Sequence, residues 1–182
     1  MPVAVTLRPY ENDVAPLLAL QDETAVFTPA PSLRELGYEP HITLAVYEDL
    51  AAPEVVAAAA KLFEGSIAIK LVFEEVRWFE GPPLTLYAAP TAAPELDAFA
   101  RRLHLLIAPG RCHPHYRPGS FVPHCTLAMG IKAEGREKAI AFARRKRISL
   151  IAAFTRGEVV AFPPPRVEAQ WHLPLANAGE HS

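Results

Sequence analysis

The sequence predicts an α+β protein of two lobes, built from internally duplicated β-α-β-α-β units with pseudo-two-fold symmetry around a central cleft. PHITLAV at residues 40–46 returns as PHCTLAM at residues 123–129, with five of seven positions identical and an offset of 124 − 41 = 83 residues. The order of β-rich and helix-forming segments is also the same in both halves. We therefore expect a single bilobal domain with approximate repeats at 1–83 and 84–175 and a disordered tail at 176–182.

The first unit is expected to contain three strands and two helices. Its first strand stops at Pro9, since proline breaks a ladder of backbone hydrogen bonds. Asn12 or Asp13 is the expected N-cap of the first helix, and Gly65 ends the second. The predicted strands are Val3–Leu7, a segment containing His41, and Ser66–Phe79, and the predicted helices are Asp13–Leu20 and Ala52–Glu64.

The second unit repeats this order and adds a final strand. Pro94 stands near the first turn of its first helix, where a missing N–H is tolerated. An irregular loop is expected at Pro109–Gly119. The predicted strands are Leu84–Ala89, a segment containing His124, a segment from Ser149, and Arg166–Leu175, and the predicted helices are Pro94–Ala108 and Glu134–Arg147.

Composition limits the class of protein. The 182 residues are 51% hydrophobic and 21% charged, as in a soluble globular domain, and the formal net charge is −2. Such a charge argues against a general nucleic-acid coat, but not against one phosphate bound in one pocket. Two cysteines form no evident disulfide framework, and there is neither a signal peptide nor an apolar run of about 20 residues. We expect a cytoplasmic protein that does not enter a membrane.

The duplicated motif predicts a constellation of side chains. Residues two apart on a strand face the same way. His41 and Thr43 therefore share one face, and His124 and Thr126 share the corresponding face of the second copy. If the two units are related by a two-fold axis, both imidazoles and both hydroxyls converge on the cleft.

Residues of the opposite parity are expected in the core. Cys125, between the second histidine and threonine, should point into the interior and be chemically inert. Tyr38 and Phe121 lie three residues before the two histidines and should also face the core. Core packing is likewise the stronger expectation for Trp78 and Trp171, although each could stack on a base.

This set of groups suits displacement at a phosphodiester. A base must take a proton from the attacking oxygen, and an acid must give one to the leaving oxygen on the opposite side. Histidine has an ordinary pKa of about 6.5, so both protonation states exist near neutral pH. The hydroxyls can donate hydrogen bonds to the non-bridging oxygens. The scheme requires no metal and no other cofactor, and a symmetric motif does not tell which histidine is the acid.

Paired His-x-Thr-Leu elements in a duplicated chain of this length resemble the 2H phosphoesterase superfamily, which includes 2′-5′ RNA ligases and RNA cyclic phosphodiesterases. The resemblance implies a bilobal fold and action on 2′,3′-cyclic phosphate or 2′-5′ linked RNA ends. It implies His41 and His124 as the acid–base pair and Thr43 and Thr126 as phosphate ligands. Some members carry an arginine shortly after the second motif, where this sequence has Met129.

The loop before the second motif is ambiguous. Cys112, His113 and His115 lack the spacing of zinc modules, so we expect no metal site there. A solvated basic loop is the simpler interpretation. Because the loop leads to His124, Arg117 or Tyr116 could contact a substrate phosphate or base.

Three functions remain open at this point. The leading one is a phosphodiesterase for a nucleotide or RNA terminus bearing a cyclic phosphate, with no obligate protein partner. The second is a cyclic phosphodiesterase for a small nucleotide-derived metabolite, which the net charge and Met129 favour. The third is a nucleotide-binding or RNA-end-binding module without turnover. Two intact pairs of histidine and threonine argue against the third, since binding alone does not need two titratable groups.

Overall fold

The computed structural model describes residues 1–28 and 31–176. Seven strands and four α-helices occur in this part of the chain, in the order β-α-β-α-β, repeated once, with one further strand. The elements are β1 (Val3–Pro9), α1 (Ala15–Thr24), β2 (Ile42–Tyr47), α2 (Ala52–Phe63), β3 (Ile69–Phe79), β4 (Leu84–Pro90), α3 (Pro94–Leu106), β5 (Cys125–Ile131), α4 (Ala133–Arg145), β6 (Arg147–Ala161) and β7 (Arg166–His172).

Two antiparallel sheets share one long strand, β6. Its second half pairs with β1 and β7, which gives a first sheet in the order β2-β1-β6-β7. Its first half pairs with β3, which gives a second sheet in the order β5-β4-β3-β6. A single residue pair, Ile42 opposite Cys125, joins β2 to β5 at the other end. The six strands from β1 to β6 therefore form a closed ring, with β7 outside it.

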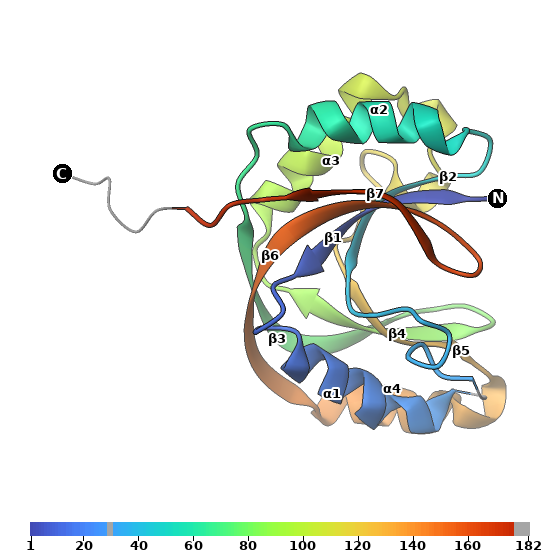
Figure 1. Cartoon of the computed structure of the whole chain (residues 1–182). Helices are drawn as coiled ribbons and strands as arrows, with labels where there is room; N and C mark the ends of the chain where they lie inside the picture. Colours follow the sequence, from blue (N-terminus) through green and yellow to red (C-terminus); the bar gives the residue numbers. More distant parts are fainter. Residues whose placement is uncertain (29–30, 177–182) are drawn as a thin grey trace.

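The helices cover the outer faces of the two sheets (Figure 1). α2 and α3 pack on the first sheet, and α1 and α4 pack on the second. Each lobe thus takes helices and strands from both halves of the chain. The α+β class and the bilobal fold are confirmed, but the lobes interleave the two predicted repeats. The duplication itself stays a prediction.

The core lies between each sheet and its helices. In β1, Val5 and Leu7 are fully buried toward the helices, whereas Thr6 faces the opposite side. Phe63 of α2 packs so closely on β6 that a Cβ on Gly157 would come within 2.5 Å of its ring. Gly157 therefore lets helix and strand approach, because any larger residue would push them apart.

The first helix begins later than predicted. α1 follows Val14, which makes no side-chain cap, and Pro16 occupies its first turn. The Asp13 carboxylate accepts a hydrogen bond from the Ala153 amide of β6 at 2.9 Å instead of capping the helix. The expectation of an Asn12 or Asp13 cap was wrong, because a tertiary partner took the carboxylate.

Other boundaries shift by a few residues. β2 and β5 begin one residue after His41 and His124, so each histidine immediately precedes its strand rather than lying within it. Two short 3₁₀ helices, Pro109–Arg111 and Pro114–Tyr116, interrupt the predicted loop. Of the predicted tail, residues 177–182 lie outside the described part. Within the described part, no helix is both long and apolar enough to cross a membrane.

Candidate active site

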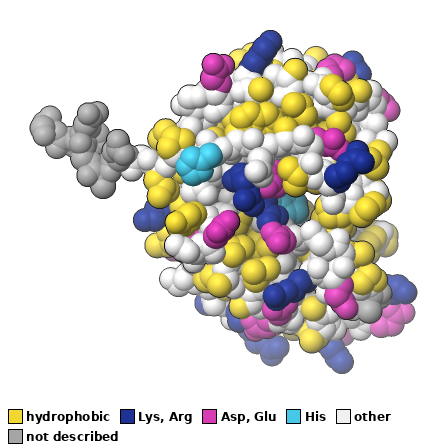
Figure 2. Space-filling view, viewed as in Figure 1, with side chains coloured by type: hydrophobic (Ala, Val, Ile, Leu, Met, Phe, Trp, Pro, Cys, Tyr) yellow, Lys and Arg dark blue, Asp and Glu magenta, His cyan; other side chains and the backbone are white. Residues whose placement is uncertain are grey.

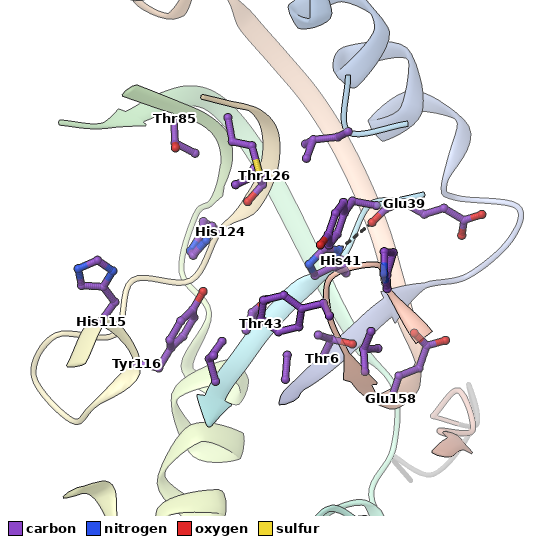
Figure 3. A pocket seen from close by; sticks show the side chains of 18 of the residues that line it. Thr6, Glu39, His41, Thr43, Thr85, His115, Tyr116, His124, Thr126 and Glu158 are labelled. Atoms are coloured by element: carbon purple, nitrogen blue, oxygen red, sulfur yellow. Dashed lines mark hydrogen bonds between the residues drawn. The ribbon is translucent and has the colours of Figure 1, made fainter. Parts of the chain in front are cut away.

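A cavity of about 1170 Å³ lies between the inner faces of the two sheets. Figure 2 shows basic, acidic and histidine side chains gathered where this face of the molecule is hollowed. All four motif residues line the cavity: His41, Thr43, His124 and Thr126. Their side chains come from neighbouring strand ends and point into the same space (Figure 3).

Both imidazoles are held by the same backbone contact. Nδ1 of His41 lies 2.7 Å from the Glu39 carbonyl, and Nδ1 of His124 lies 2.7 Å from the Val122 carbonyl. A carbonyl only accepts, so in each case Nδ1 carries the proton and donates it. In the neutral ring Nε2 is then the free basic atom, and in the charged ring Nε2 carries the acidic proton.

The junction of β2 and β5 determines how the two motifs face each other. Ile42 and Cys125 are antiparallel partners and both are fully buried. His41 and Thr43 flank Ile42, and His124 and Thr126 flank Cys125. Side chains alternate between faces, so these four point away from the core and into the cavity. Both imidazoles and both hydroxyls therefore line one cavity.

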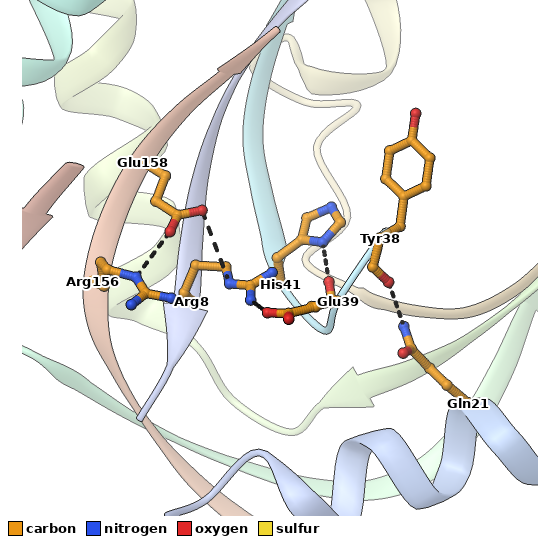
Figure 4. Close-up of polar contacts among 7 residues, drawn as sticks. All are labelled: Arg8, Gln21, Tyr38, Glu39, His41, Arg156 and Glu158. Carbon is orange, nitrogen blue, oxygen red and sulfur yellow. Dashed lines mark hydrogen bonds and ion pairs between the residues drawn. The ribbon is translucent and has the colours of Figure 1, made fainter. Parts of the chain in front are cut away.

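His41 stands in a chain of charged groups (Figure 4). Arg8 forms ion pairs with Glu39, whose carbonyl holds His41, and with Glu158, at 3.9 Å between Nε and Oε2. Arg156 pairs with Glu158 from the other side, at 2.8 Å. Burial, then the positive charge of Arg8, and then His124 lower the pKa of His41 to about 4.

His124 stands among aromatic rings instead. Phe79 contacts it edge-on with 4.9 Å between ring centroids, and Tyr87 and Tyr116 lie at 5.6 and 6.4 Å. Burial lowers the pKa of His124, while the hydrogen bond to the Val122 carbonyl acts in the opposite direction. The two imidazoles thus make the same backbone contact but have different neighbouring side chains.

The loop residues predicted to bind substrate divide into two cases. Tyr116 lines the cavity and contacts Thr43, and burial raises the pKa of its hydroxyl. Arg117 is not among the residues that line the cavity. It donates to the carbonyls of Cys112 at 2.8 Å and Gly110 at 3.3 Å, so the structure gives it the role of holding the loop. Its contact with substrate stays a prediction.

Cys125 and Tyr38 were both expected to face the core. Cys125 is buried as predicted, and burial raises the pKa of its thiol to about 12. Tyr38 lines the cavity, so the expectation of a core position was wrong. The residue precedes Pro40 and lies outside β2, where strand parity does not apply.

In the described ranges, no three histidine, cysteine or acidic side chains form a group that could hold a metal ion.

The first sheet carries a set of polar side chains that the sequence did not predict as part of the site. Strand register aligns Thr43, Thr6, Glu158 and Gln170 in a row across β2, β1, β6 and β7, and all four line the cavity. A neighbouring row contains Arg8 and Arg156. The only local signal was a charged pair, Arg156 and Glu158, on one face of an otherwise apolar strand.

The fold and the two His-x-Thr elements indicate a class of two-lobed phosphoesterases. The family model for the 2′-5′ RNA ligase superfamily matches residues 36–160. The chain therefore belongs to this superfamily, whose members are 2H phosphoesterases. No curated protein sequence matches it significantly.

Solved structures of low sequence identity share the fold. TT0787 of Thermus thermophilus has 19% identity and a TM-score of 0.66, with 100% of both chains covered. E. coli LigT in complex with 3′-AMP has 15% identity and a TM-score of 0.63, covering 95% of this chain and 99% of LigT. Usb1 of Kluyveromyces marxianus has 9% identity and a TM-score of 0.54, covering 96% and 98%.

Proposed function

We propose that this protein is a metal-independent phosphodiesterase that acts on 2′,3′-cyclic phosphate or 2′-5′ linked RNA ends. One observation carries the proposal. Two imidazoles enter one cavity, each with Nδ1 bonded to a backbone carbonyl and with no partner for Nε2 among the described residues, and two threonines line the same cavity. Membership of the 2′-5′ RNA ligase superfamily supports the same chemistry.

The reaction needs two proton transfers in opposite directions. Nε2 of the neutral imidazole takes a proton from water as the water oxygen bonds to phosphorus. Nε2–H of the charged imidazole gives a proton to the ribose oxygen as its bond to phosphorus breaks. Thr43 and Thr126 donate hydrogen bonds to the non-bridging oxygens, where negative charge collects. Exchange of one proton with solvent then restores both rings.

The surroundings of the two rings favour His41 as the base. Its pKa of about 4 keeps it neutral at pH 7, and the nearby Arg8 opposes its protonation. Burial also lowers the pKa of His124, but the charged group that acts on it is His115 rather than an arginine. A bound phosphate, being negative, would raise the pKa of the ring that acts as acid.

The test is turnover of adenosine 2′,3′-cyclic phosphate and of an RNA ending in a cyclic phosphate, with EDTA present. His41→Ala and His124→Ala are each expected to lower kcat by about a hundredfold or more, since each removes one proton transfer. His172→Ala, at an exposed histidine of β7, is the matched control and should keep full activity.

Each alternative has its own outcome in this experiment. Loss of activity in EDTA that added metal restores would contradict a metal-independent mechanism. A nucleotide that binds but stays intact over hours would indicate a binding module. If neither substrate is turned over, we would propose another cyclic phosphate as the substrate, such as that of a small nucleotide-derived metabolite. The substrate and a cytoplasmic location are parts of this proposal.

A further inference from the structure

We infer that the cavity contains a second anion subsite, built on Arg156 and Arg8, which binds a further phosphate group of the substrate. The inference rests on the proposed function, because it assigns the reacting phosphate to the two histidines. It predicts that the substrate has at least two phosphate groups, and it places the second one over the first sheet.

Strand register places the two arginines in line with the first histidine. Arg8 on β1 is paired with Arg156 on β6, and Leu7 is paired with Ile42, the residue after His41. Neighbouring strands lie about 4.8 Å apart, so Arg156 is about 10 Å from His41 across two strands. Both arginines line the same cavity as the histidine.

The guanidinium of Arg156 has N–H groups that no described residue accepts. Its Nε lies 2.8 Å from a Glu158 carboxylate oxygen in an ion pair that lacks hydrogen-bond geometry, and no side-chain nitrogen of Arg156 donates to an acceptor among the residues that the structure describes. Glu158 is almost fully buried, whereas a third of the Arg156 side chain is exposed. The carboxylate therefore fixes the guanidinium from one side and leaves its outer edge to the cavity. A guanidinium held in this way suits bidentate contact with phosphate oxygens.

Arg8 and Arg156 bring two guanidiniums to a cavity wall that also carries Glu39, Glu80 and Glu158. Arg8 is paired with both Glu39 and Glu158, and Glu80 is paired with Arg136, which stands outside the cavity lining. Arg156 shares the buried Glu158 with Arg8. The positive charge that an anion can contact is therefore local, at the exposed edge of Arg156.

A buried hydroxyl connects the two sites. Thr6 is paired with Thr43 on one side and Glu158 on the other, and its Oγ1 is buried at the cavity wall with no hydrogen-bond partner in the described part of the chain. Buried hydroxyls normally have a partner. A ligand that extends from the histidines to Arg156 would pass this hydroxyl and satisfy it.

The rest of the cavity has room for such a ligand. Its volume of about 1170 Å³ exceeds the usual upper range of about 1,000 Å³ for small-ligand pockets. A row of small apolar side chains follows the polar row on the same sheet and can take the flat face of a base. This row consists of Val46, Ala4, Val160 and Val167.

The second phosphate could be an internucleotide phosphodiester or a 5′-phosphate, and three substrates distinguish these. They are adenosine 2′,3′-cyclic phosphate, its 5′-phosphorylated form, and the dinucleotide ApA ending in a cyclic phosphate. We expect at least one substrate with two phosphates to exceed the first by about tenfold in kcat/KM, as one charge-assisted contact would provide. The preferred substrate shows whether the second phosphate is a 5′-phosphate or an internucleotide phosphodiester.

Arg156→Met should remove most of this preference. The ratio of kcat/KM for the preferred two-phosphate substrate to kcat/KM for adenosine 2′,3′-cyclic phosphate should then lie within about threefold of one. Arg147→Met, on the same strand but outside the cavity, is the matched control and should keep the full ratio. A ratio near one in the wild type would overturn the inference. An equal loss on all three substrates in Arg156→Met would also overturn it, because the arginine would then serve the reacting phosphate.

Binding separates this inference from the proposed function. The affinities of 3′-AMP and adenosine 3′,5′-bisphosphate are compared by calorimetry, since neither contains a cyclic phosphate. Tighter binding of the bisphosphate, lost in Arg156→Met, supports the subsite even if no cyclic phosphate is turned over. Equal affinities contradict it even if turnover is found. If Arg156→Met unfolds because Glu158 loses a partner, the double variant with Glu158→Gln removes both charges and gives the same ratios.

Discussion

At the scale of single residues, the hydroxyls of two threonines are proposed to donate hydrogen bonds to the phosphate oxygens in the transition state. Thr43 is buried at the cavity wall next to Tyr116. Thr43→Val keeps a β-branched side chain of similar shape and removes only the hydroxyl. We expect kcat/KM for a cyclic phosphate to fall about tenfold to hundredfold with the melting temperature little changed.

The control for this variant is Thr91→Val, which removes an exposed hydroxyl outside the cavity. It should leave kcat/KM unchanged. Full activity of Thr43→Val would show that the hydroxyl does not contact the reacting phosphate.

The low pKa of His41 also predicts how stability depends on pH. In the unfolded chain the ordinary pKa is about 6.5, whereas it is about 4 in the folded protein. Between these values the unfolded state binds a proton that the folded state does not. The free energy of unfolding therefore falls as the pH is lowered from 6.5 to 4, and the contribution is constant above pH 7.

His41→Gln should reduce this decrease in the free energy of unfolding by about 1–2 kcal/mol, allowing for the part of the ring that faces solvent. Urea unfolding at pH 7, 5.5 and 4 measures it, with the exposed His172→Gln as control. Parallel curves for wild type and His41→Gln would mean that the ring titrates normally in the folded state.

At the scale of elements, the approach of α2 to β6 positions the charged pair of the first sheet. Gly157 lies between Arg156 and Glu158, under the Phe63 ring. Phe63 also packs against Phe99 and Trp171, at 5.9 and 5.4 Å between centroids, so it has little freedom to move.

Gly157→Ala should therefore reduce the free energy of unfolding by about 1–3 kcal/mol, the usual effect of overpacking. Thermal or urea unfolding gives the value. Gly110→Ala is the control, since a Cβ there meets nothing within 4 Å, and its effect should be small. An unchanged stability of Gly157→Ala would mean that β6 can shift away from the helix.

The elements also show what a sequence can predict. Strand parity placed His41 and Thr43 on one face, because the rule is local and the motif was long enough to apply it. It failed for Tyr38, which lies before Pro40 and outside the strand. Arg8 and Arg156 were missed, since their meeting depends on the pairing of β1 with β6, which are far apart in the chain.

At the scale of the whole molecule, the two halves of the chain depend on each other. β1 belongs to the first half and pairs with β6 of the second, and β3 pairs with both β4 and β6. Residues 1–83 alone would leave the edges of β1 and β3 unpaired and their apolar faces exposed.

We therefore expect fragments 1–83 and 84–182 to show no cooperative melting when separate, and to regain one transition when mixed. Circular dichroism with temperature, at matched concentrations, tests this. A cooperative transition of either fragment alone would contradict the interleaved core.

The two cysteines give this molecule internal probes of its own opening. Cys112 lies in the loop that carries Tyr116, Cys125 lies at the junction of the two sheets, and both thiols are buried. A reagent that modifies free thiols reaches each one only when its surroundings open. The rate at Cys112 then reports how often the loop lifts from the cavity, and the rate at Cys125 reports separation of β2 from β5. A bound nucleotide should slow both reactions, so labelling can detect ligands without any assay of turnover.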